Sequence, residues 1–289
     1  MSWLERLLPP HIKRGGEQRQ SIPSGLWLKC PACEAVLYRA DLEANLHVCP
    51  KCSHHLRIRA RARLDALLDT GGRHEIGQEV LPVDTLKFKG SKSYPERLKA
   101  AMEATGETDA MIVISGAILS VPVVVACFEF DFMGGSMGAV VGERFVRGVQ
   151  AAIDQHVPFI CITASGGARM QEGLMSLMQM AKTTAMLTKL AEKKLPFVSV
   201  LTDPTSGGIS ASFCFLGDVV LAEPKALIAF TGVRVIKSTL GVTLPDGYQR
   251  PEFLLERGAI DMIVDRRAMR AELAALLALL LKLPKDALA

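Results

Sequence analysis

Short apolar runs alternate with glycine-rich loops and longer amphipathic stretches through the central part of this 289-residue chain. Residues 109–132 read DAMIVISGAILSVPVVVACFEFDF, whose β-branched, apolar character predicts two buried strands with a break at residues 120–122. Beyond them the order is strand, glycine loop, helix, strand, glycine loop, helix. This alternation predicts an α/β fold with right-handed crossovers between its strands.

The chain divides into three parts by composition. Residues 1–25 are polar and interrupted by glycine and proline, which predicts a mobile N-terminal arm. Residues 26–55 contain closely spaced cysteines and form a small module, and residues 56–289 form one large domain. With 49% hydrophobic residues, the chain has enough apolar side chains for a sizeable core.

Three helices are predicted outside the alternating region. The segment HLRIRARARLDALLDTGG predicts a helix stopped by the glycines at residues 71–72, and YPERLKAAMEATG predicts one between Pro95 and Gly106. The segment AELAALLALLLKLP predicts a packed terminal helix that could meet another subunit. No stretch reaches the roughly 18 apolar residues that cross a bilayer.

Two nearly repeated segments each end in a pair of glycines. PFICITASGG covers residues 158–167, and PFVSVLTDPTSGG covers residues 196–208. Glycines between a strand and a helix permit positive φ and leave the first N–H groups of the helix unpaired. Two such loops can direct backbone amides at one oxygen, which is the geometry of an oxyanion hole. Tight turns explain the glycines equally well, and a phosphate cradle is the rival functional interpretation.

The loops carry few side chains that could react. The chain has no GxxxxGK[ST] motif and no GxGxxG in a βαβ setting, which disfavours P-loop and dinucleotide enzymes. Ser165 lies in ASGGA and not in a G-x-S-x-G elbow. Asp203 and Glu172 are candidate acids or bases, but Asp203 fits a turn cap and Glu172 can pair with Arg169. Amides without an obvious base favour enolate chemistry in which the substrate or a cofactor supplies the base.

Four cysteines have the C-x2-C-x15-C-x2-C spacing of a zinc ribbon: Cys30, Cys33, Cys49 and Cys52. Four thiolates fill a tetrahedral site and leave no position for a reacting water, so the spacing predicts one structural zinc ion. Two disulfides are the alternative, which the absence of a signal-like N-terminus disfavours. His47, His54 and His55 lie nearby but are not needed to complete the set.

Other sulfur-containing residues are predicted to pack in the core. The cysteines of this group are Cys127, Cys161 and Cys214, and the methionines are Met170, Met175, Met178, Met180 and Met186.

Positive charge is concentrated near the N-terminus. Residues 1–63 hold eleven Lys or Arg and five Asp or Glu, an excess of +6 in a chain of net charge +4. Such a basic head could face nucleic acid or the phosphates of a nucleotide-bearing substrate. The alternative is that its arginines, among them Arg57, Arg59, Arg61 and Arg63, line a solvated face.

Three segments, together with the cysteine module, resemble the carboxyltransferase beta subunits of bacterial acetyl-CoA carboxylase. They are TASGGARMQEGLMSLMQMAKT, LTDPTSGGISASFCFLGDVVLAEPKALIAFTG and FDFMGGSMGAVVGERF, within a resemblance over about residues 26–282. It implies a crotonase-like ββα spiral fold preceded by the zinc ribbon. It also implies carboxyl transfer from carboxybiotin on a biotin carrier protein to acetyl-CoA, which gives malonyl-CoA for fatty-acid synthesis.

The resemblance implies roles for the glycine loops. In this family the ureido nitrogen of biotin is the base, and backbone amides hold the enolate oxygen. By position these amides belong to Gly166, Gly167, Gly207 and Gly208, with Ala168 as a further candidate. Gly134 and Gly135 would lie near acyl-CoA or biotin.

The resemblance also implies partners. They are an alpha subunit of similar fold in an α2β2 assembly, the biotin carboxyl carrier protein and biotin carboxylase, in the cytoplasm and without a membrane. We expect the ribbon to lie over the active-site cleft with its basic residues facing the CoA phosphates, and nucleic acid to be at most a secondary ligand. A crotonase-like hydrolase or isomerase is a further alternative, and it would need Glu172 as its base.

Overall fold

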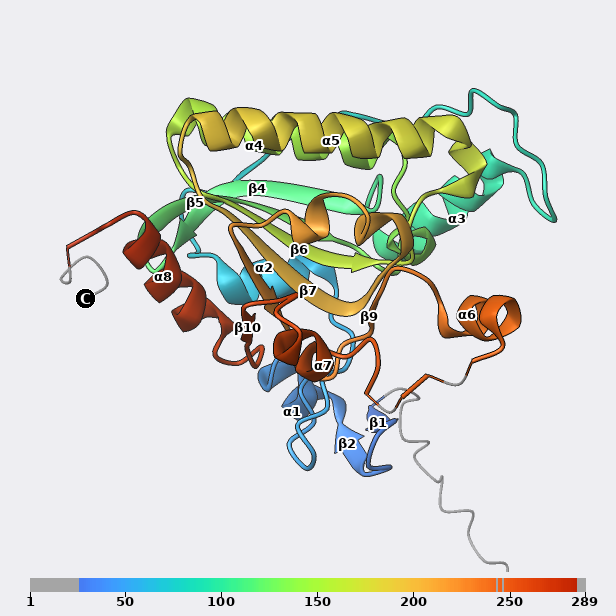
Figure 1. Ribbon diagram of the computed structural model, residues 1–289, viewed down its shortest axis with the longest axis horizontal. Helices are drawn as coiled ribbons and strands as arrows, with labels where there is room; N and C mark the ends of the chain where they lie inside the picture. Colours follow the sequence, from blue (N-terminus) through green and yellow to red (C-terminus); the bar gives the residue numbers. More distant parts are fainter. Residues whose placement is uncertain (1–25, 243, 246, 285–289) are drawn as a thin grey trace, which may run out of the picture.

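The computed structural model describes residues 26–242, 244–245 and 247–284, so the predicted N-terminal arm lies outside the described residues. Within these ranges eight strands form one mixed sheet in the order β10-β8-β7-β6-β5-β4-β3, and β9 also pairs with β7 (Figure 1). They are β3 (His74–Glu75), β4 (Met111–Ile118), β5 (Val121–Phe128), β6 (Phe159–Ser165), β7 (Phe197–Ser206), β8 (Val219–Ala222), β9 (Ile228–Ala229) and β10 (Met262–Ile263). The pairings between β5 and β10 are parallel, whereas β3, β4 and β5 pair antiparallel. The predicted strand pair in residues 109–132 is therefore confirmed as a β4–β5 hairpin.

Helices cover both faces of this sheet. They are α1 (Arg39–Ala44), α2 (Ala60–Leu67), α3 (Tyr94–Thr105), α4 (Ala139–Gln155), α5 (Leu174–Glu192), α6 (Val233–Leu240), α7 (Pro251–Glu256) and α8 (Met269–Leu280). α4 and α5 lie side by side on one face, and α2 and α8 lie on the other (Figure 1). The small sheet of β1 (Trp27–Lys29) and β2 (Val36–Tyr38) extends from the α2 side together with α1. None of the described helices is both long and apolar enough to cross a membrane.

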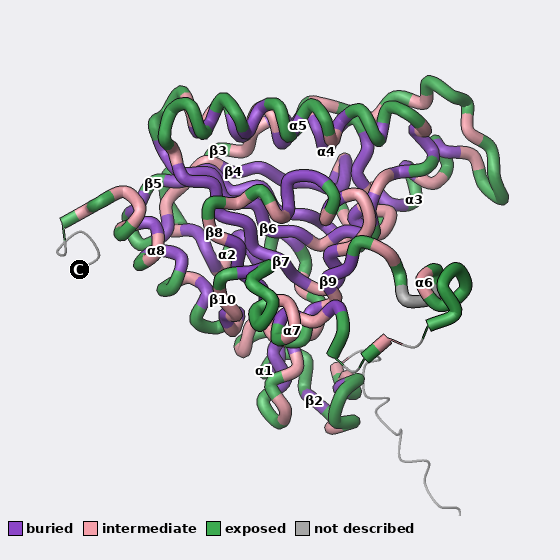
Figure 2. The backbone as a smooth tube through the Cα atoms, viewed as in Figure 1, coloured by how far each residue is buried: buried purple, intermediate pink, exposed green. Residues whose placement is uncertain are grey.

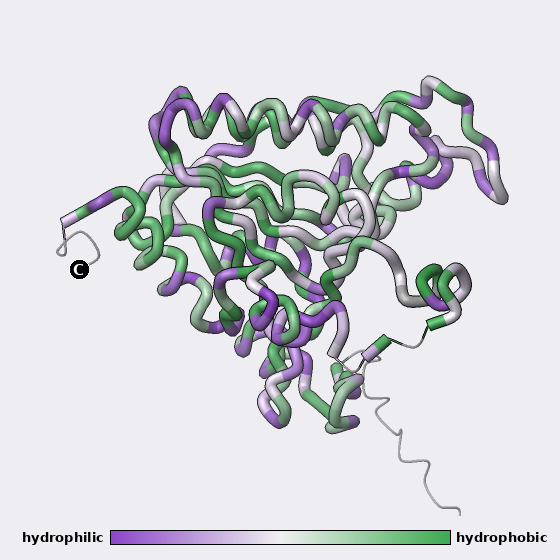
Figure 3. Tube along the Cα trace, viewed as in Figure 1, coloured by the Kyte–Doolittle hydropathy of each residue, from purple (hydrophilic) through white to green (hydrophobic). Residues whose placement is uncertain are grey.

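Alternate residues of the strands feed two separate cores. In β6, Phe159 and Cys161 pack towards α4, whereas Ile160 and Ile162 pack towards α2 and α8. Both faces of the sheet are covered, so these strands are apolar almost continuously, as Figures 2 and 3 show for the centre of the molecule. The repeated Pro-Phe segments lie side by side, because Phe159 is in register with Phe197 and both rings contact Phe145 of α4.

Two helix boundaries differ from the prediction. α2 ends at Leu67, four residues before the glycines, because residues 68–70 run beside the β4–β5 turn. There the Asp69 carboxylate accepts from the N–H groups of Leu119 and Ser120 at 3.0 and 2.8 Å. α5 begins at Leu174, after the short 3-10 helix Met170–Glu172 and a break at Gly173, whose φ is 52°.

The core cysteines are confirmed and part of the methionine prediction is wrong. Cys127, Cys161 and Cys214 are buried, and burial raises the pKa of the Cys127 thiol to about 12, which keeps it unreactive. Met186 is buried, but three of the predicted core methionines are exposed: Met170, Met175 and Met178. Met170 lies in the 3-10 helix before α5, and Met175 and Met178 lie in the first turns of α5, where no described layer covers them.

A buried cluster of charges joins the cysteine module to the large domain. The carboxylate of Glu223, at the end of β8, pairs with Arg63 of α2 and with Arg266 at 2.6 Å. The same Arg266 side chain donates to the carbonyl groups of Leu46 and Leu56 at 3.0 and 2.8 Å. One buried carboxylate therefore fixes α2, the segment before α8 and the end of the small module.

We predict that Glu223→Gln weakens this junction in a pH-dependent way. Burial alone would raise the pKa of the Glu223 carboxyl, but Arg63 and Arg266 lower it to about 2. A depressed folded pKa means that the carboxylate stabilises the protein above the unfolded value of about 4.3 and loses this effect as the pH falls towards 2. Urea unfolding should show Glu223→Gln as less stable at pH 7, with the difference from wild type shrinking between about pH 5 and about pH 2.

The exposed Glu34→Gln variant is the control, since Glu34 pairs only with Lys29 on the surface. Its difference from wild type should stay below about 1 kcal/mol. A difference for Glu223→Gln that stays constant over the same pH range would contradict the prediction.

Candidate active site and zinc ribbon

The two Gly-Gly loops lie side by side at the carboxyl ends of β6 and β7. Ser165 is in register with Thr205, so both strands end at the same level of the sheet. A Cβ atom built on Gly167 would lie 3.2 Å from the backbone nitrogen of Gly208. The sequence repeat therefore brings the two predicted amide loops into contact.

Most of the predicted amides already have acceptors within the protein. Gly166 N donates to Gly134 O at 2.9 Å, Gly167 N donates to Ser165 Oγ at 3.0 Å, and Gly207 N donates to Phe230 O at 3.1 Å. In the described part of the chain, no acceptor is recorded for the amides of Ala168 and Gly208.

Ala168 and Gly208 are close neighbours. A Cβ built on Gly208 would lie 3.5 Å from the backbone nitrogen of Ala168. Two N–H groups without an acceptor, from different loops, therefore lie close together, as an oxyanion hole requires. Of the five candidate amides, those of Gly208 and Ala168 are the two without an acceptor among the described residues.

A third glycine loop, which contains Gly134 and Gly135, packs against the loop that follows β6. Gly134 accepts the hydrogen bond from Gly166, and Gly135 passes so close to β6 that a Cβ atom would lie 2.0 Å from Ala164 O. Only glycine fits at residue 135, where φ is 64°. Gly134 reaches a cleft, whereas Gly135 is buried against β6.

A cleft of about 790 Å³ opens between these loops and α3. Its lining includes Gly134, Gly166, Gly167 and Ala168 from the glycine loops, and Arg97, Ala100, Ala101 and Ala104 from α3. Among the described residues, no histidine or cysteine lines it, and its one carboxylate, Asp131, pairs with Arg59 at 3.6 Å. The cleft therefore offers amides and space, without a nucleophile and its base.

Arg169, the residue after Ala168, is fully buried and neutralised. Its guanidinium forms a bidentate pair with Asp109 at 2.7 and 2.9 Å and donates to Ser136 O at 2.8 Å. Tyr94 of α3 accepts a further hydrogen bond from Arg169 at 3.0 Å. One side chain thus fixes the Ala168 loop against the third glycine loop, α3 and the beginning of β4.

Glu172, a candidate acid or base in the sequence analysis, has a structural role instead. The expected pair with Arg169 forms at 3.2 Å, and Glu172 also accepts from Tyr94 Oη at 2.5 Å and from Ala139 N at 2.6 Å. Its side chain is almost fully buried and holds the beginning of α4. Asp203 accepts from Leu227 N at 2.8 Å, but it lies within β7, so the prediction of a turn cap is wrong.

The four ribbon cysteines have the geometry of a zinc site. Cys30 Sγ lies 3.7 Å from Cys52 Sγ, Cys33 Sγ lies 3.8 Å from Cys49 Sγ, and all four sulfurs lie within 4.8 Å of one another. Four sulfurs at the usual Zn–S distance of about 2.3 Å are roughly 3.8 Å apart, and this set fits that tetrahedron.

The two halves of the ribbon repeat one turn. In each, the residue four positions after the first cysteine donates to that cysteine's carbonyl, at 2.9 Å for both Glu34 to Cys30 and Ser53 to Cys49. Glu34 and Ser53 both have positive φ. The backbone of each C-x2-C segment is therefore folded to present two sulfurs on one side.

The ribbon is not where the sequence placed it. None of the residues 26–55 lines the cleft with the glycine loops; ribbon residues Arg39 and His47 border a separate hollow that shares only Phe130 and Asp131 with the cleft. The expectation of ribbon residues in that cleft is wrong, because Arg266 anchors the ribbon beneath the opposite face of the sheet.

The basic head is also largely compensated. Arg61 pairs with Glu107 and Glu75, and Arg63 is buried against Glu223, so the prediction of a solvated face is wrong for Arg63. Arg57 is exposed and lies over the ring of Phe130.

Two family models match this chain. The acetyl-CoA carboxylase zinc finger domain matches residues 27–52. The carboxyl transferase domain matches residues 83–249, which is more than half of the chain. The chain belongs to the carboxyl transferase domain family. Its members' fold and the four-cysteine cluster confirm the predicted crotonase-like α/β fold with a zinc ribbon.

Solved carboxyl transferases have the same fold. Transcarboxylase 12S, a hexamer crystallised with methylmalonyl-coenzyme A and methylmalonic acid, is 30% identical with a TM-score of 0.66, over 77% of this chain and 41% of that one. A Pseudomonas malonate decarboxylase hetero-tetramer in complex with malonate is 25% identical with a TM-score of 0.61, over 76% and 82%. The beta subunit of P. aeruginosa geranyl-CoA carboxylase, at 19% identity and a TM-score of 0.60 over 83% and 42%, shows the fold alone. This carboxyl transferase chain thus spans about 41% of the length of the transcarboxylase 12S chain.

We predict that Cys30→Ser removes the zinc of this carboxyl transferase. The hydrophobic cluster inside the ribbon has four buried members, which is too small to hold the module without metal: Cys30, Leu37, Leu42 and Cys49. Metal analysis of the purified protein should find one zinc per wild-type chain and almost none in the variant.

Cys161→Ala is the matched control, because Cys161 is buried in the large domain away from the ribbon. It should retain one zinc per chain. Zinc retained by Cys30→Ser, or lost from Cys161→Ala, would refute the assignment.

Proposed function

We propose that this chain is the beta subunit of the carboxyltransferase of an acetyl-CoA carboxylase. It would transfer the carboxyl group from carboxybiotin, on a biotin carboxyl carrier protein charged by biotin carboxylase, to acetyl-CoA. The product, malonyl-CoA, is the committed intermediate of fatty-acid synthesis. The observation that carries this proposal is the pair of neighbouring amides without an acceptor, that of Gly208 and that of Ala168, of which Ala168 lines a cleft with no histidine, cysteine or unpaired carboxylate among the described residues.

The two amides account for enolate stabilisation. When acetyl-CoA binds with its thioester oxygen between Ala168 N–H and Gly208 N–H, both donors favour the charge that develops as the methyl group loses its proton. Removing one such donor costs about 2.7–4 kcal/mol of transition-state stabilisation in other enzymes. Carboxybiotin supplies the carboxyl group and a basic nitrogen, which agrees with the absence of a basic side chain in the cleft.

The loops keep these donors ready before substrate arrives. Gly166, Gly167 and Gly207 use their own N–H groups to hold the loops in place. Gly207 adopts a φ of 70°, and its bond to Phe230 O turns the next amide, that of Gly208, away from the protein's own acceptors. Preorganised donors need no rearrangement during the reaction.

The acetyl group is proposed as the acyl substrate because of the ribbon. Residues 27–52 match the zinc finger domain of acetyl-CoA carboxylase specifically, whereas the similar solved structures include enzymes named for methylmalonyl-CoA, malonate and geranyl-CoA.

The decisive experiment is reconstitution with the partner subunit. Wild-type chain, its alpha subunit, biotin and malonyl-CoA should form acetyl-CoA in the reverse reaction. We predict that Gly208→Val lowers kcat at least about 100-fold, because valine would fill the space beside Ala168 N–H. The two atoms nearest a Cβ at residue 208 are the flexible ends of Met180 and Met137, at 2.9 and 3.3 Å, and the backbone nitrogen of Ala168 follows at an ordinary contact distance of 3.5 Å, so the fold should persist.

Gly71→Val is the control, because a Cβ there has no atom within 4 Å. It should keep wild-type kcat, and circular dichroism should show all three proteins folded. Absence of acetyl-CoA formation by the wild-type complex would reject the function, and full activity of Gly208→Val would reject the role of its amide.

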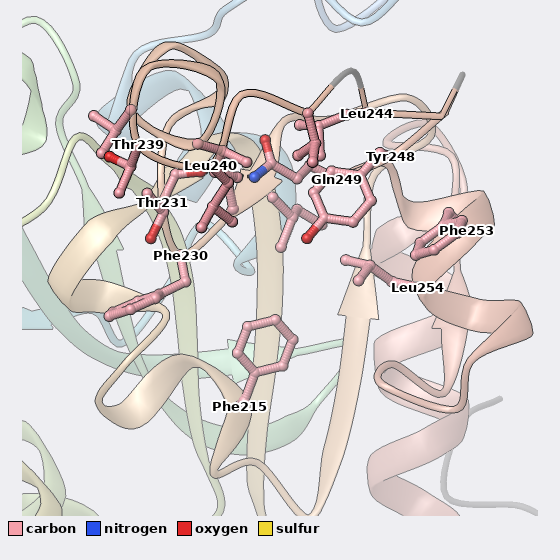
Figure 4. A pocket seen from close by; sticks show the side chains of 15 residues that line it. Phe215, Phe230, Thr231, Thr239, Leu240, Leu244, Tyr248, Gln249, Phe253 and Leu254 are labelled. Carbon is pink, nitrogen blue, oxygen red and sulfur yellow. Dashed lines mark hydrogen bonds between the residues drawn. The ribbon is translucent and has the colours of Figure 1, made fainter.

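Exposed apolar surface supports the alpha subunit as a partner. Met170 lines the cleft and, like Leu174 and Met178, is more than half exposed. A second apolar surface surrounds a hollow of about 630 Å³ between α6, β9 and α7, into which Phe215, Leu240 and Tyr248 project (Figure 4). α6 is mostly exposed in Figure 2 although it carries hydrophobic segments in Figure 3. Apolar patches of this kind mark interfaces between proteins.

We predict that Leu240→Asp prevents association with the alpha subunit. Leu240 is 67% exposed at the end of α6 and borders this hollow. A carboxylate there would have to be desolvated in the interface, so size-exclusion chromatography should show the variant as a separate species.

Leu279→Asp is matched to it, since Leu279 is 74% exposed near the end of α8, at the opposite end of the molecule in Figure 1. It should co-elute with the alpha subunit as wild type does. The α6 surface is excluded as an interface if Leu240→Asp also co-elutes, and loss of binding only in Leu279→Asp would assign the interface to α8.

A further inference from the structure

Two cations line the cleft without a direct ion pair among the described residues, although Lys92 lies near enough to Glu96 to help lower the pKa of that carboxyl, after the hydrogen bonds from Ser93. Lys92 and Arg97 border the same cleft as Ala168. Arg97 Nη2 donates to Ser91 Oγ at 3.2 Å, and its buried Nε atom has no acceptor in the part of the chain that the structure describes. Within the same ranges, no carboxylate oxygen lies within 4.0 Å of either side chain's nitrogens.

Three other arginines, by contrast, form ion pairs with carboxylates. Arg59 pairs with Asp131 at 3.6 Å, Arg61 with Glu107 at 2.6 Å, and Arg169 with Asp109 at 2.7 Å. Their charges are used inside the protein. The guanidinium of Arg97 lines the cleft with only Ser91 as a side-chain partner, so its charge is left for an anionic ligand.

The surface between Arg97 and the rest of the cleft is open. Ala101 and Ala104 follow Arg97 at i+4 and i+7 on α3, and with Ala100 they line the cleft with small side chains. Seven residues of helix correspond to about 10 Å, so the α3 face provides an extended, unobstructed path. A long, thin ligand could therefore reach from the guanidinium to the glycine loops.

We propose that Arg97, together with Lys92, binds the phosphate groups at the nucleotide end of the acyl-CoA substrate. This inference rests on the proposed function, which places the thioester oxygen at Ala168 and Gly208. CoA carries its phosphates at the far end of a flexible pantetheine arm, and guanidinium groups bind phosphate through two parallel hydrogen bonds. The phosphate contacts that the sequence suggested for the ribbon are thereby assigned to the segment before and within α3.

The first test measures binding directly. Titration calorimetry of the wild-type chain with CoA, and of Arg97→Gln with CoA, should show affinity at least about tenfold weaker in the variant, as expected for loss of a hydrogen bond to a charged group. Arg97→Lys should recover part of this loss because it restores the charge. Lys99→Gln is the control, because Lys99 lies on the same helix, outside the cleft lining, and pairs with Glu103 at 3.9 Å.

The second test separates phosphate recognition from a structural role. In the reconstituted reaction run forward from carboxylated biotin, Arg97→Gln should raise the KM for acetyl-CoA about tenfold and leave kcat within about twofold. With acetyl-pantetheine, which lacks all phosphates, wild type and variant should have the same KM. An equal loss with both substrates, or no loss with either, overturns the proposal. Binding of inorganic phosphate or an oligonucleotide that depends on Arg97, with CoA binding unaffected, also overturns it.

Failure of the two proposals can be told apart. A wild-type complex that does not transfer carboxyl groups, but whose CoA binding depends on Arg97, rejects the proposed reaction and supports the phosphate site. A complex that transfers normally while Arg97→Gln changes neither affinity nor KM supports the reaction and rejects the phosphate site.

Discussion

The buried guanidinium of Arg169 is the interaction on which the candidate active site depends. It has no contact with solvent, so its charge must be neutralised, and Asp109 and Glu172 provide this within 3.2 Å. Leaving such a charge unpaired typically costs about 3–5 kcal/mol. Because Arg169 follows Ala168 directly, the pairs that neutralise it also set where the Ala168 amide points. The ion pairs that neutralise Arg169 in the interior thus also fix the position of the neighbouring amide at the surface of the cleft.

The opposite face of the sheet uses the same device for another purpose. There Glu223 is the buried ion, and Arg63 and Arg266 neutralise it while Arg266 also holds carbonyl groups at the end of the ribbon. The zinc ion closes the ribbon upon itself, and this cluster attaches it to the large domain. The ribbon is therefore built into the far side of the sheet from α4 and α5, and the hollow beside it shares Phe130 and Asp131 with the cleft.

The sequence predicted what depends on local pattern. Strand alternation gave β4 to β7, cysteine spacing gave the four sulfurs, and the repeat gave the adjacent loops. It could not select the unpaired amides, because the acceptor of Gly166 lies at residue 134 and that of Gly207 at residue 230. The prediction that Met170, Met175 and Met178 pack in the core was wrong for a related reason. A Met-rich pattern shows which face of a helix is apolar, but not whether the same chain provides the residues that cover it. Ala168 was only a further candidate beside the glycines, and nothing in the local sequence marks Arg97, because the cleft that both residues line is formed by segments far apart in the chain.

The proposed site would bind and polarise a thioester with backbone amides and cations, and its described lining contains no histidine, no cysteine and no unpaired carboxylate that could remove a proton. The two ends of the proposed substrate would be fixed by Arg97 and by the amides of Ala168 and Gly208, which leaves the reacting methyl group as the part that this chain does not cover. Met170 joins the cleft to the exposed apolar surface of α5, so whatever covers that surface also closes the cleft. Exclusion of water by a second protein would strengthen both amide hydrogen bonds, because their electrostatic energy rises as the local dielectric constant falls. Two features therefore support the proposed dependence on a partner subunit. One is the lack of a proton-removing group in the described cleft lining, and the other is the exposed apolar surface around the cleft.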